Sequence, residues 1–307
     1  MPTTSTEELF ATPARSLPPV DPAGAAAGPW RGAVRRLRRD RSAMVGLAAL
    51  AALALAAVFA PLVAPYDPID QPDIIGLKSL PPSLAHPFGT DQASRDVLSR
   101  VIYGARVSLG VAALSMLVAI TMGTIYGAVA GYRGGRTDAA MMRAVDTLLS
   151  IPRILLLIAV LSLWTRTPIL ALVLLIGFTG WFGVSRIVRA QVLSLKEREF
   201  VVAARALGAS GPRLLVRHIL PNVASPIVVA ATLGVGHVII LEAGLSYLGL
   251  GVQPPQASWG SIIRDGSEQV TTLWWISLFP GLAIVLTVMA LNALGDGMRD
   301  ALDVRGR

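Results

Sequence analysis

A run of residues without any charged side chain extends from Ser42 to Tyr66, and it consists largely of alanine and leucine. A helix needs about 20 apolar residues to cross a bilayer, so this run is long enough for one crossing. A cleaved signal peptide is the alternative, but the run begins far from Met1 and is longer than the apolar part of a signal peptide. The sequence therefore predicts a first membrane helix over residues 43–64.

Five further stretches are apolar over a similar length, and we expect spans at about residues 101–131, 139–163, 169–188, 223–249 and 273–294. Only 15% of the residues are charged and 53% are hydrophobic, whereas a soluble domain carries roughly a quarter charged residues. This composition excludes an ordinary soluble enzyme. The predicted fold is an all-α, polytopic membrane protein with six transmembrane helices.

The positions of the basic residues predict the orientation. Six crossings place both termini on one side, and with the termini in the cytoplasm twenty of the 27 Lys and Arg residues are cytoplasmic and five are not. Cytoplasmic loops of membrane proteins carry this excess. We therefore interpret the net charge of +8 as a signal of topology and expect no nucleic-acid partner. Residues 1–42 are predicted to be a disordered basic cytoplasmic segment, and residues 298–307 a cytoplasmic tail.

The segment between the first two spans is rich in proline. Its prolines are Pro65, Pro68, Pro72, Pro81, Pro82 and Pro87. Because repeated proline prevents a helix from continuing, residues 65–100 are predicted to be an extended extracytoplasmic loop. Residues 101–297 then form the transmembrane core.

A long cytoplasmic loop, residues 194–222, has a helical pattern. Phe200, Ala203, Ala204 and Leu207 recur at spacings that place them on one side of a helix. Gly208 predicts the end of this helix, since glycine tolerates a left-handed conformation.

A second short helix is expected to follow in the same loop. Ser210 is a candidate N-cap, Pro212 lies in the first turn, and Pro221 is predicted to end the helix before the fifth span. Arg213 adds charge to this surface. A small, alanine-rich helix face suits docking into a groove of a partner, but it is equally consistent with a helix lying on lipid or on its own bundle.

Gly123, Gly127 and Gly131 repeat every four residues in the second span. Small residues at this spacing let membrane helices approach closely. The pattern favours a packing face within the chain over a subunit interface, because it reports close packing and not the identity of the partner.

Several polar residues lie inside the predicted spans. Glu242 and His237 occur in the fifth, Asn292 in the sixth, and Asp146 with Arg153 in the third. Ionisable groups in hydrocarbon usually face protein or a water-filled path. For Glu242 we favour a hydrogen bond to a neighbouring helix over a position that lines a substrate path. We favour the same interhelical role for Asn292. Asp146 and Arg153 are candidates for an internal pair.

The chain lacks the motifs of a self-sufficient enzyme. A phosphate-binding loop needs Gly-Lys-Ser/Thr, whereas the two lysines, Lys78 and Lys196, each follow a leucine. The three histidines form no HExxH zinc motif. We expect no metal, catalytic residue or cofactor in this chain, so an ATP-driven process would need a partner.

Several separated motifs resemble a known family. Ala203, Ala204 and Gly208 followed by His218-Ile219-Leu220-Pro221-Asn222 are similar to the loop of membrane subunits of bacterial ATP-binding-cassette importers. That pattern normally has glutamate where this chain has Val202. Four more stretches resemble the second membrane subunit of the dipeptide/oligopeptide/nickel class: residues 86–91 with 95–100 (HPFGTD, RDVLSR), 245–251 (LSYLGLG), 254–260 (PPQASWG) and 292–296 (NALGD).

The resemblance implies a type I importer permease fold in the cytoplasmic membrane of a bacterium. It further implies a homologous permease as partner, two cytoplasmic ATPase domains that hold ATP and Mg, and an extracytoplasmic peptide-binding protein. The helix around residues 203–213 would couple ATPase closure to the spans. Dipeptides or oligopeptides are the expected substrates, with nickel chelates or another small solute as the alternative. A secondary transporter driven by an ion gradient, with Glu242, Asp146 and His237 as relay groups, is the rival from another class.

Overall fold

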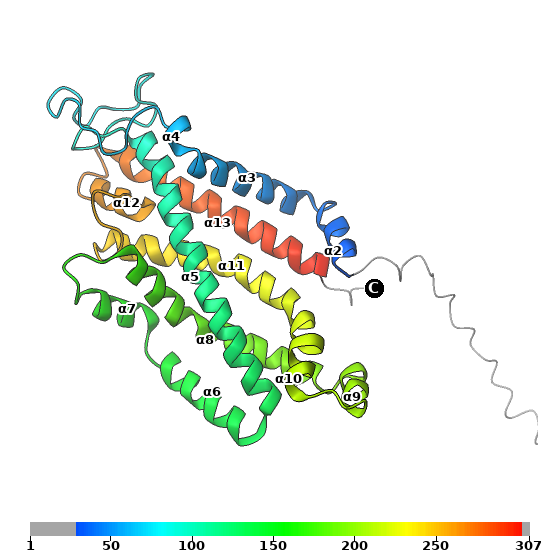
Figure 1. Cartoon of the computed structure of the whole chain (residues 1–307). Helices are drawn as coiled ribbons and strands as arrows, with labels where there is room; N and C mark the ends of the chain where they lie inside the picture. The colour runs from blue at the N-terminus through cyan, green and yellow to red at the C-terminus, as the bar shows by residue number, and fades with distance from the viewer. Residues whose placement is uncertain (1–28, 303–307) are drawn as a thin grey trace, which may run out of the picture.

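Long apolar helices run side by side through the molecule in the computed structural model, which describes residues 29–302 (Figure 1). The helices are α2 Pro29–Leu37, α3 Arg41–Val58, α4 Ala60–Val63, α5 Val97–Arg133, α6 Gly135–Leu149, α7 Arg153–Leu161, α8 Ile169–Leu195, α9 Glu199–Ala206, α10 Gly211–Leu214, α11 Leu220–Tyr247, α12 Trp259–Ser267 and α13 Trp274–Leu302. A π-helical turn, Leu215–Ile219, joins α10 to α11. The part of the chain described contains no strand, only one isolated bridge between Thr90 and Asp96.

Two ends of the bundle carry different elements (Figure 1). The loop of residues 64–96 and helix α12 lie at one end, which we call the loop end. Helices α2, α9 and α10 lie at the other, the α9 end. Each long helix runs from one end toward the other, so the two surfaces are separated by the length of the spans.

Five helices are long and apolar enough to cross a membrane: α3, α5, α8, α13 and the continuous stretch Gly211–Tyr247 that contains α11. The sixth predicted span, over residues 139–163, is not one straight helix. It is formed by α6 and α7, which meet at 69°. Residues 29–302 therefore hold six spans only if this bent pair is counted as one crossing.

The bend follows from Pro152. Proline lacks a backbone N–H and disfavours a helical conformation at the residue before it, which here is Ile151. Helix α6 ends with Ser150 as its C-cap, and α7 begins directly after Pro152.

The segment predicted to be disordered was too long. Residues 29–37 of the segment predicted to be disordered form α2, because Ala33 is buried and Arg36 Nε donates to the Ala301 carbonyl at 2.8 Å. Similarly α13 continues to Leu302, so the predicted tail is helical from 298 to 302. Residues 1–28 and 303–307 lie outside the described part.

Arg106 is a charged residue within the second span, and its side chain binds the last carbonyl groups of the first span. Its Nε donates to the Ala57 carbonyl at 3.0 Å and its Nη2 to the Val58 carbonyl at 2.8 Å. The last carbonyls of a helix have no partner within the helix, so Arg106 supplies one to α3 from α5.

Candidate functional site

The short helix α9 presents an apolar stripe away from the bundle. Phe200 is 44% exposed and Leu207 is 89% exposed, and Ala203 between them is also exposed. Ala204, which the spacing placed in the same stripe, is half-buried and contacts the bundle instead. Three of the four residues predicted for this face thus share an open surface.

Val201 fixes the opposite side of α9, and the sequence reasoning missed it. It is fully buried in a cluster that includes Val192, Leu214 and Ile219. The exposed stripe is therefore carried by a helix whose opposite side belongs to a cluster with α8, α10 and the π-helical turn.

Gly208 adopts φ +85° and ends α9. Glycine tolerates this positive φ because it has no Cβ to clash with the backbone. No atom lies within 4 Å of the position that a Cβ would occupy, so the requirement comes from the backbone alone. Ser210 occupies the N-cap position of α10, but its side chain makes no capping hydrogen bond. Arg213 is exposed in α10.

Pro221 does not end a helix, contrary to the prediction. Helix α10, the π-turn and α11 form one continuous stretch, and Pro221 lies in its interior. The wider π-turn immediately before it, closed by the Leu220 N–H on the Leu215 carbonyl, accommodates the missing N–H of the proline. Helix α10 is therefore continuous with the membrane helix α11.

The three glycines of α5 face α8. A Cβ at Gly123 would lie 2.6 Å from Val184 Cβ, and one at Gly131 would lie 2.9 Å from the Arg189 carbonyl oxygen. A Cβ at Gly127 would collide with the carbonyl oxygen of Ser185. The stripe lies in a packing face within the chain.

Glu242 is completely buried between three helices. Ser246 Oγ donates to its Oε1 at 2.6 Å, and Ser108 Oγ of α5 donates to its Oε2 at 3.1 Å. The Trp259 backbone N–H at the start of α12 donates to Ser108 Oγ at 3.2 Å. This geometry matches an interhelical role, and it links α5, α11 and α12 at the loop end.

The predicted internal pair of Asp146 and Arg153 does not form. Asp146 instead pairs with Arg186 of α8. Arg153 Nε donates to Thr179 Oγ1 at 2.9 Å and its Nη2 to the Ile176 carbonyl at 2.7 Å. The bend between α6 and α7 turns the two side chains to different partners, which spacing on a straight helix could not anticipate.

His237 and Asn292 are both exposed on the outside of α11 and α13. His237 Nδ1 lies 3.1 Å from the Leu233 carbonyl of its own helix. Neither side chain has a hydrogen bond to another helix within the described residues, so the interhelical role expected for Asn292 is not seen there, and the relay role of His237 stays a prediction.

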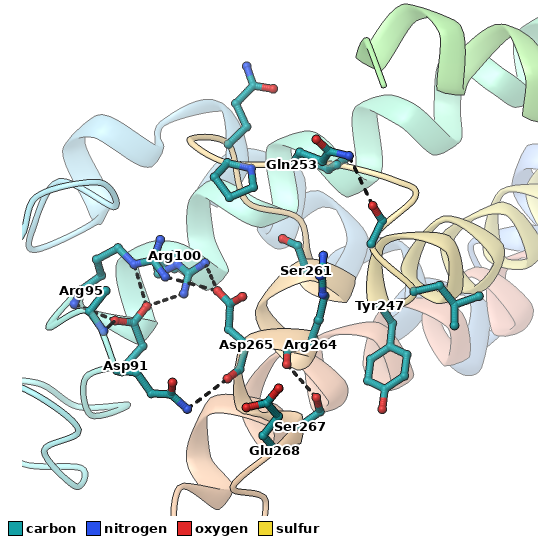
Figure 2. A pocket seen from close by; sticks show the side chains of 17 residues that line it. Asp91, Arg95, Arg100, Tyr247, Gln253, Ser261, Arg264, Asp265, Ser267 and Glu268 are labelled. Atoms are coloured by element: carbon teal, nitrogen blue, oxygen red, sulfur yellow. Dashed lines mark hydrogen bonds and ion pairs between the residues drawn. The ribbon is translucent and has the colours of Figure 1, made fainter. Parts of the chain in front are cut away.

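A network of charges lies at the loop end beside a cavity of roughly 960 Å³ (Figure 2). Asp91 is buried and pairs with Arg100, while Arg95 Nε donates to Asp91 Oδ2 at 2.8 Å. Asp265 of α12 accepts from Arg100 Nη2 at 2.8 Å and Arg95 Nη2 at 3.2 Å. Arg264 and Glu268 also line this cavity.

This network ties the loop before α5 to α12. Asp91, Arg95 and Arg100 stand in the motif stretches 86–91 and 95–100, whereas no sequence pattern singled out Asp265. Nearby, the N–H groups of Gly76 and Ile75 hold the pKa of Asp73 below its usual range. Gly89, with φ +73°, lets Leu80 and Trp275 approach the loop closely. Residues 29–302 contain no cluster of three or more His, Asp or Glu side chains suited to a metal ion.

The fold and these surfaces define a polytopic α-helical membrane protein. A family model for a "Binding-protein-dependent transport system inner membrane component" matches residues 123–307, and one for the "N-terminal TM domain of oligopeptide transport permease C" matches residues 28–82. The chain belongs to this family of inner membrane transport components.

Curated relatives cover most of the chain. It is 42% identical over 277 residues to the dipeptide transport system permease protein DppC of Bacillus subtilis (strain 168), covering 89% of this chain and 85% of that protein. It is 40% identical over 278 residues to the oligopeptide transport system permease protein OppC of the same strain, covering 91% and 90%. Against OppC of Haemophilus influenzae the identity is 39% over 282 residues, covering 91% and 89%.

Proposed function

We propose that this chain is the second membrane subunit of an ATP-driven importer and encloses, together with a homologous permease, a path for dipeptides or oligopeptides. Two cytoplasmic ATPase domains would bind ATP and Mg, and an extracytoplasmic binding protein would deliver substrate. The peptide substrate is carried over from the names of the relatives.

The observation that carries the coupling role is the anchored stripe of α9. Exposed apolar side chains, Phe200 and Leu207, stand beside an exposed alanine on a helix fixed by Val201. Apolar anchors around a small residue are typical of a helix that fits a groove. Since α10 continues into α11 without a break, closure of a partner around α9 would move a membrane span.

The variant Ala203→Trp would test the coupling role. The bulky ring stands in the centre of the exposed stripe, so binding of the ATPase subunits should weaken about tenfold, equivalent to ~1.4 kcal/mol. In liposomes with all partners, peptide uptake should fall while ATP hydrolysis continues. Ala140→Trp, an exposed alanine of α6, is the matched control and should transport normally.

Two results would refute this function. Peptide uptake by the purified chain alone, without partners and ATP, would make it a secondary transporter. Normal coupling of Ala203→Trp would assign α9 to the lipid surface.

We further propose that both termini are cytoplasmic, with α6 and α7 together as one crossing. The chain contains no cysteine, so single cysteines introduced at Ser83 and Ser210 would report opposite sides to an impermeant thiol reagent. Labelling of both from the same side would overturn this topology.

A further inference from the structure

Four arginines gather where α2 joins α3. Arg35, Arg38, Arg39 and Arg41 lie within seven residues and all have exposed side chains. Within residues 29–302, the ion pairs involve other residues only. The proposed function uses α9 and the spans and leaves this cluster, which we call the α2–α3 arginine cluster, without a role.

The cluster is held on a fixed base. Arg36, between its members, donates to the Ala301 carbonyl of α13 at 2.8 Å, and Ala33 is only 5% exposed. A Cβ at Gly297 of α13 would lie 3.4 Å from Leu37 Cδ1. Helix α2 is therefore packed on the last turns of α13, which holds the four guanidinium groups outward.

The acidic residue among these arginines, Asp40, caps a helix. Asp40 is the N-cap of α3, where its Oδ1 accepts from the Ser42 hydroxyl at 2.7 Å, the Ser42 N–H at 2.9 Å and the Ala43 N–H at 3.2 Å. The Ser42 hydroxyl first, and then the Ala43 N–H, lower the pKa of Asp40. Its acceptor capacity is thus directed at the helix start, and the arginines keep an excess of positive charge.

The cluster also lies at the end of a span that the rest of the chain leaves largely uncovered. Arg41 is the first residue of α3, and only 17% of the apolar part of α3 is buried in the chain, against 50% for α8. Val45 is 70% exposed one turn further along. A span this exposed contacts lipid, so basic residues at its end stand beside the phosphate layer.

We propose that the α2–α3 arginine cluster binds the phosphate groups of anionic phospholipids in the leaflet at the α9 end. Guanidinium groups pair with phosphate through two parallel hydrogen bonds, and basic clusters beside a span attract anionic lipids. An ATPase partner is the less favoured occupant, because α2 lies on α13, whereas α9 lies on the other side of the same end (Figure 1).

The test compares purified full-length variants by native mass spectrometry in detergent containing equal phosphatidylglycerol and phosphatidylcholine. One variant replaces all four arginines of the cluster with glutamine, and another replaces them with lysine. The control changes four exposed arginines elsewhere at the same end to glutamine: Arg133, Arg136, Arg143 and Arg217. All three variants and the wild type are first checked for an unchanged far-UV circular dichroism spectrum.

We expect the wild type and the control to retain phosphatidylglycerol in preference to phosphatidylcholine. The glutamine cluster variant should bind phosphatidylglycerol about tenfold or more weakly, since each arginine near the surface contributes to the attraction. The lysine variant keeps the charge but loses the two parallel hydrogen bonds of each guanidinium, so its binding of phosphatidylglycerol should fall between that of the wild type and that of the glutamine variant. If the glutamine variant does not fold, a lysine variant that binds phosphatidylglycerol as strongly as the wild type would overturn the proposal. Unchanged binding by the glutamine variant, equal loss in the control, or weakened binding of the ATPase subunits with lipid binding intact would overturn the proposal.

Discussion

Gly123 and Gly127 allow α5 to approach α8 so closely that one added methyl group has no room. A Cβ at Gly123 would stand 2.6 Å from Val184 Cβ and 2.8 Å from the Trp181 carbonyl oxygen. At Gly127 the obstacle is the backbone carbonyl of Ser185, which cannot rotate away as a side chain can. We therefore predict that Gly123→Ala and Gly127→Ala each destabilise the chain.

Two opposing effects set the size of the change in the free energy of unfolding. Forcing an extra methyl group into a packed interface costs about 1–3 kcal/mol, while alanine is favoured over glycine inside a helix by about 0.5–1 kcal/mol. With mid-range values of ~2 kcal/mol for the clash and ~0.75 kcal/mol for the helix preference at each site, the net loss for the double variant is ~2–3 kcal/mol. Gly110 lies in the same helix with no atom within 4 Å of its Cβ position, so Gly110→Ala keeps only the favourable term.

The assay is thermal unfolding of the purified chain in detergent, followed by tryptophan fluorescence. With a shift of ~2–4 °C per kcal/mol for a protein of this size range, the double variant should unfold about 5–10 °C lower, and Gly110→Ala at the same or a slightly higher temperature. An equal loss for Gly110→Ala would show that the effect comes from glycine flexibility. An unchanged double variant would show that α5 and α8 are not closely packed.

Gly208→Val should raise the free energy of the α9–α10 turn by about 1–3 kcal/mol, because valine disfavours positive φ, and it should reduce coupled uptake without preventing membrane insertion. Glu242→Ala should lower the unfolding temperature by the equivalent of ~2–4 kcal/mol, since two buried serine hydroxyls lose their acceptor; Glu242→Gln, which keeps an acceptor, should cost less than half of that. Arg100→Gln should expose the loop of residues 64–96 to protease, because Asp91 stays buried with one fewer cation, whereas Lys78→Gln, on an exposed lysine of the same loop, should not. The difference in the free energy of unfolding between the wild type and Asp40→Asn should be present at neutral pH and shrink as the pH falls below about 4. The pKa of Asp40 is lowered in the folded chain, so the stabilisation by its carboxylate is lost when the carboxylate is protonated. A difference that does not change with pH would contradict the capping role.

The apolar helices were predictable because each is specified locally. Composition over some 20 residues decides whether a segment crosses a bilayer, and the cap of α9 needed only the identity of Gly208. The predicted spans accordingly overlap α3, α5, α8, α11 and α13. Their ends were less predictable, since α2 and the last turns of α13 are helical through contact with each other.

The third span shows where local reasoning fails. Hydropathy continues across residues 139–163, so the segment reads as one crossing, yet Pro152 bends it by 69°. Pro226 and Pro280 lie inside helices that remain single elements, and Pro221 follows a π-turn. Sequence alone does not distinguish these outcomes, because the neighbouring helices decide whether the freed backbone groups find partners.

The polar residues of the spans fall into two groups, those with partners inside the chain and those without. No spacing rule in the sequence could predict these partners. Arg106 and Arg153 donate to backbone carbonyls of other segments, and Glu242 accepts from serines. Each is thereby held by partners inside this chain. His237 and Asn292 remain exposed on α11 and α13. Since polar groups facing hydrocarbon are costly, a partner helix or a water-filled path should cover these two, and residues that contact substrate should be sought beside them.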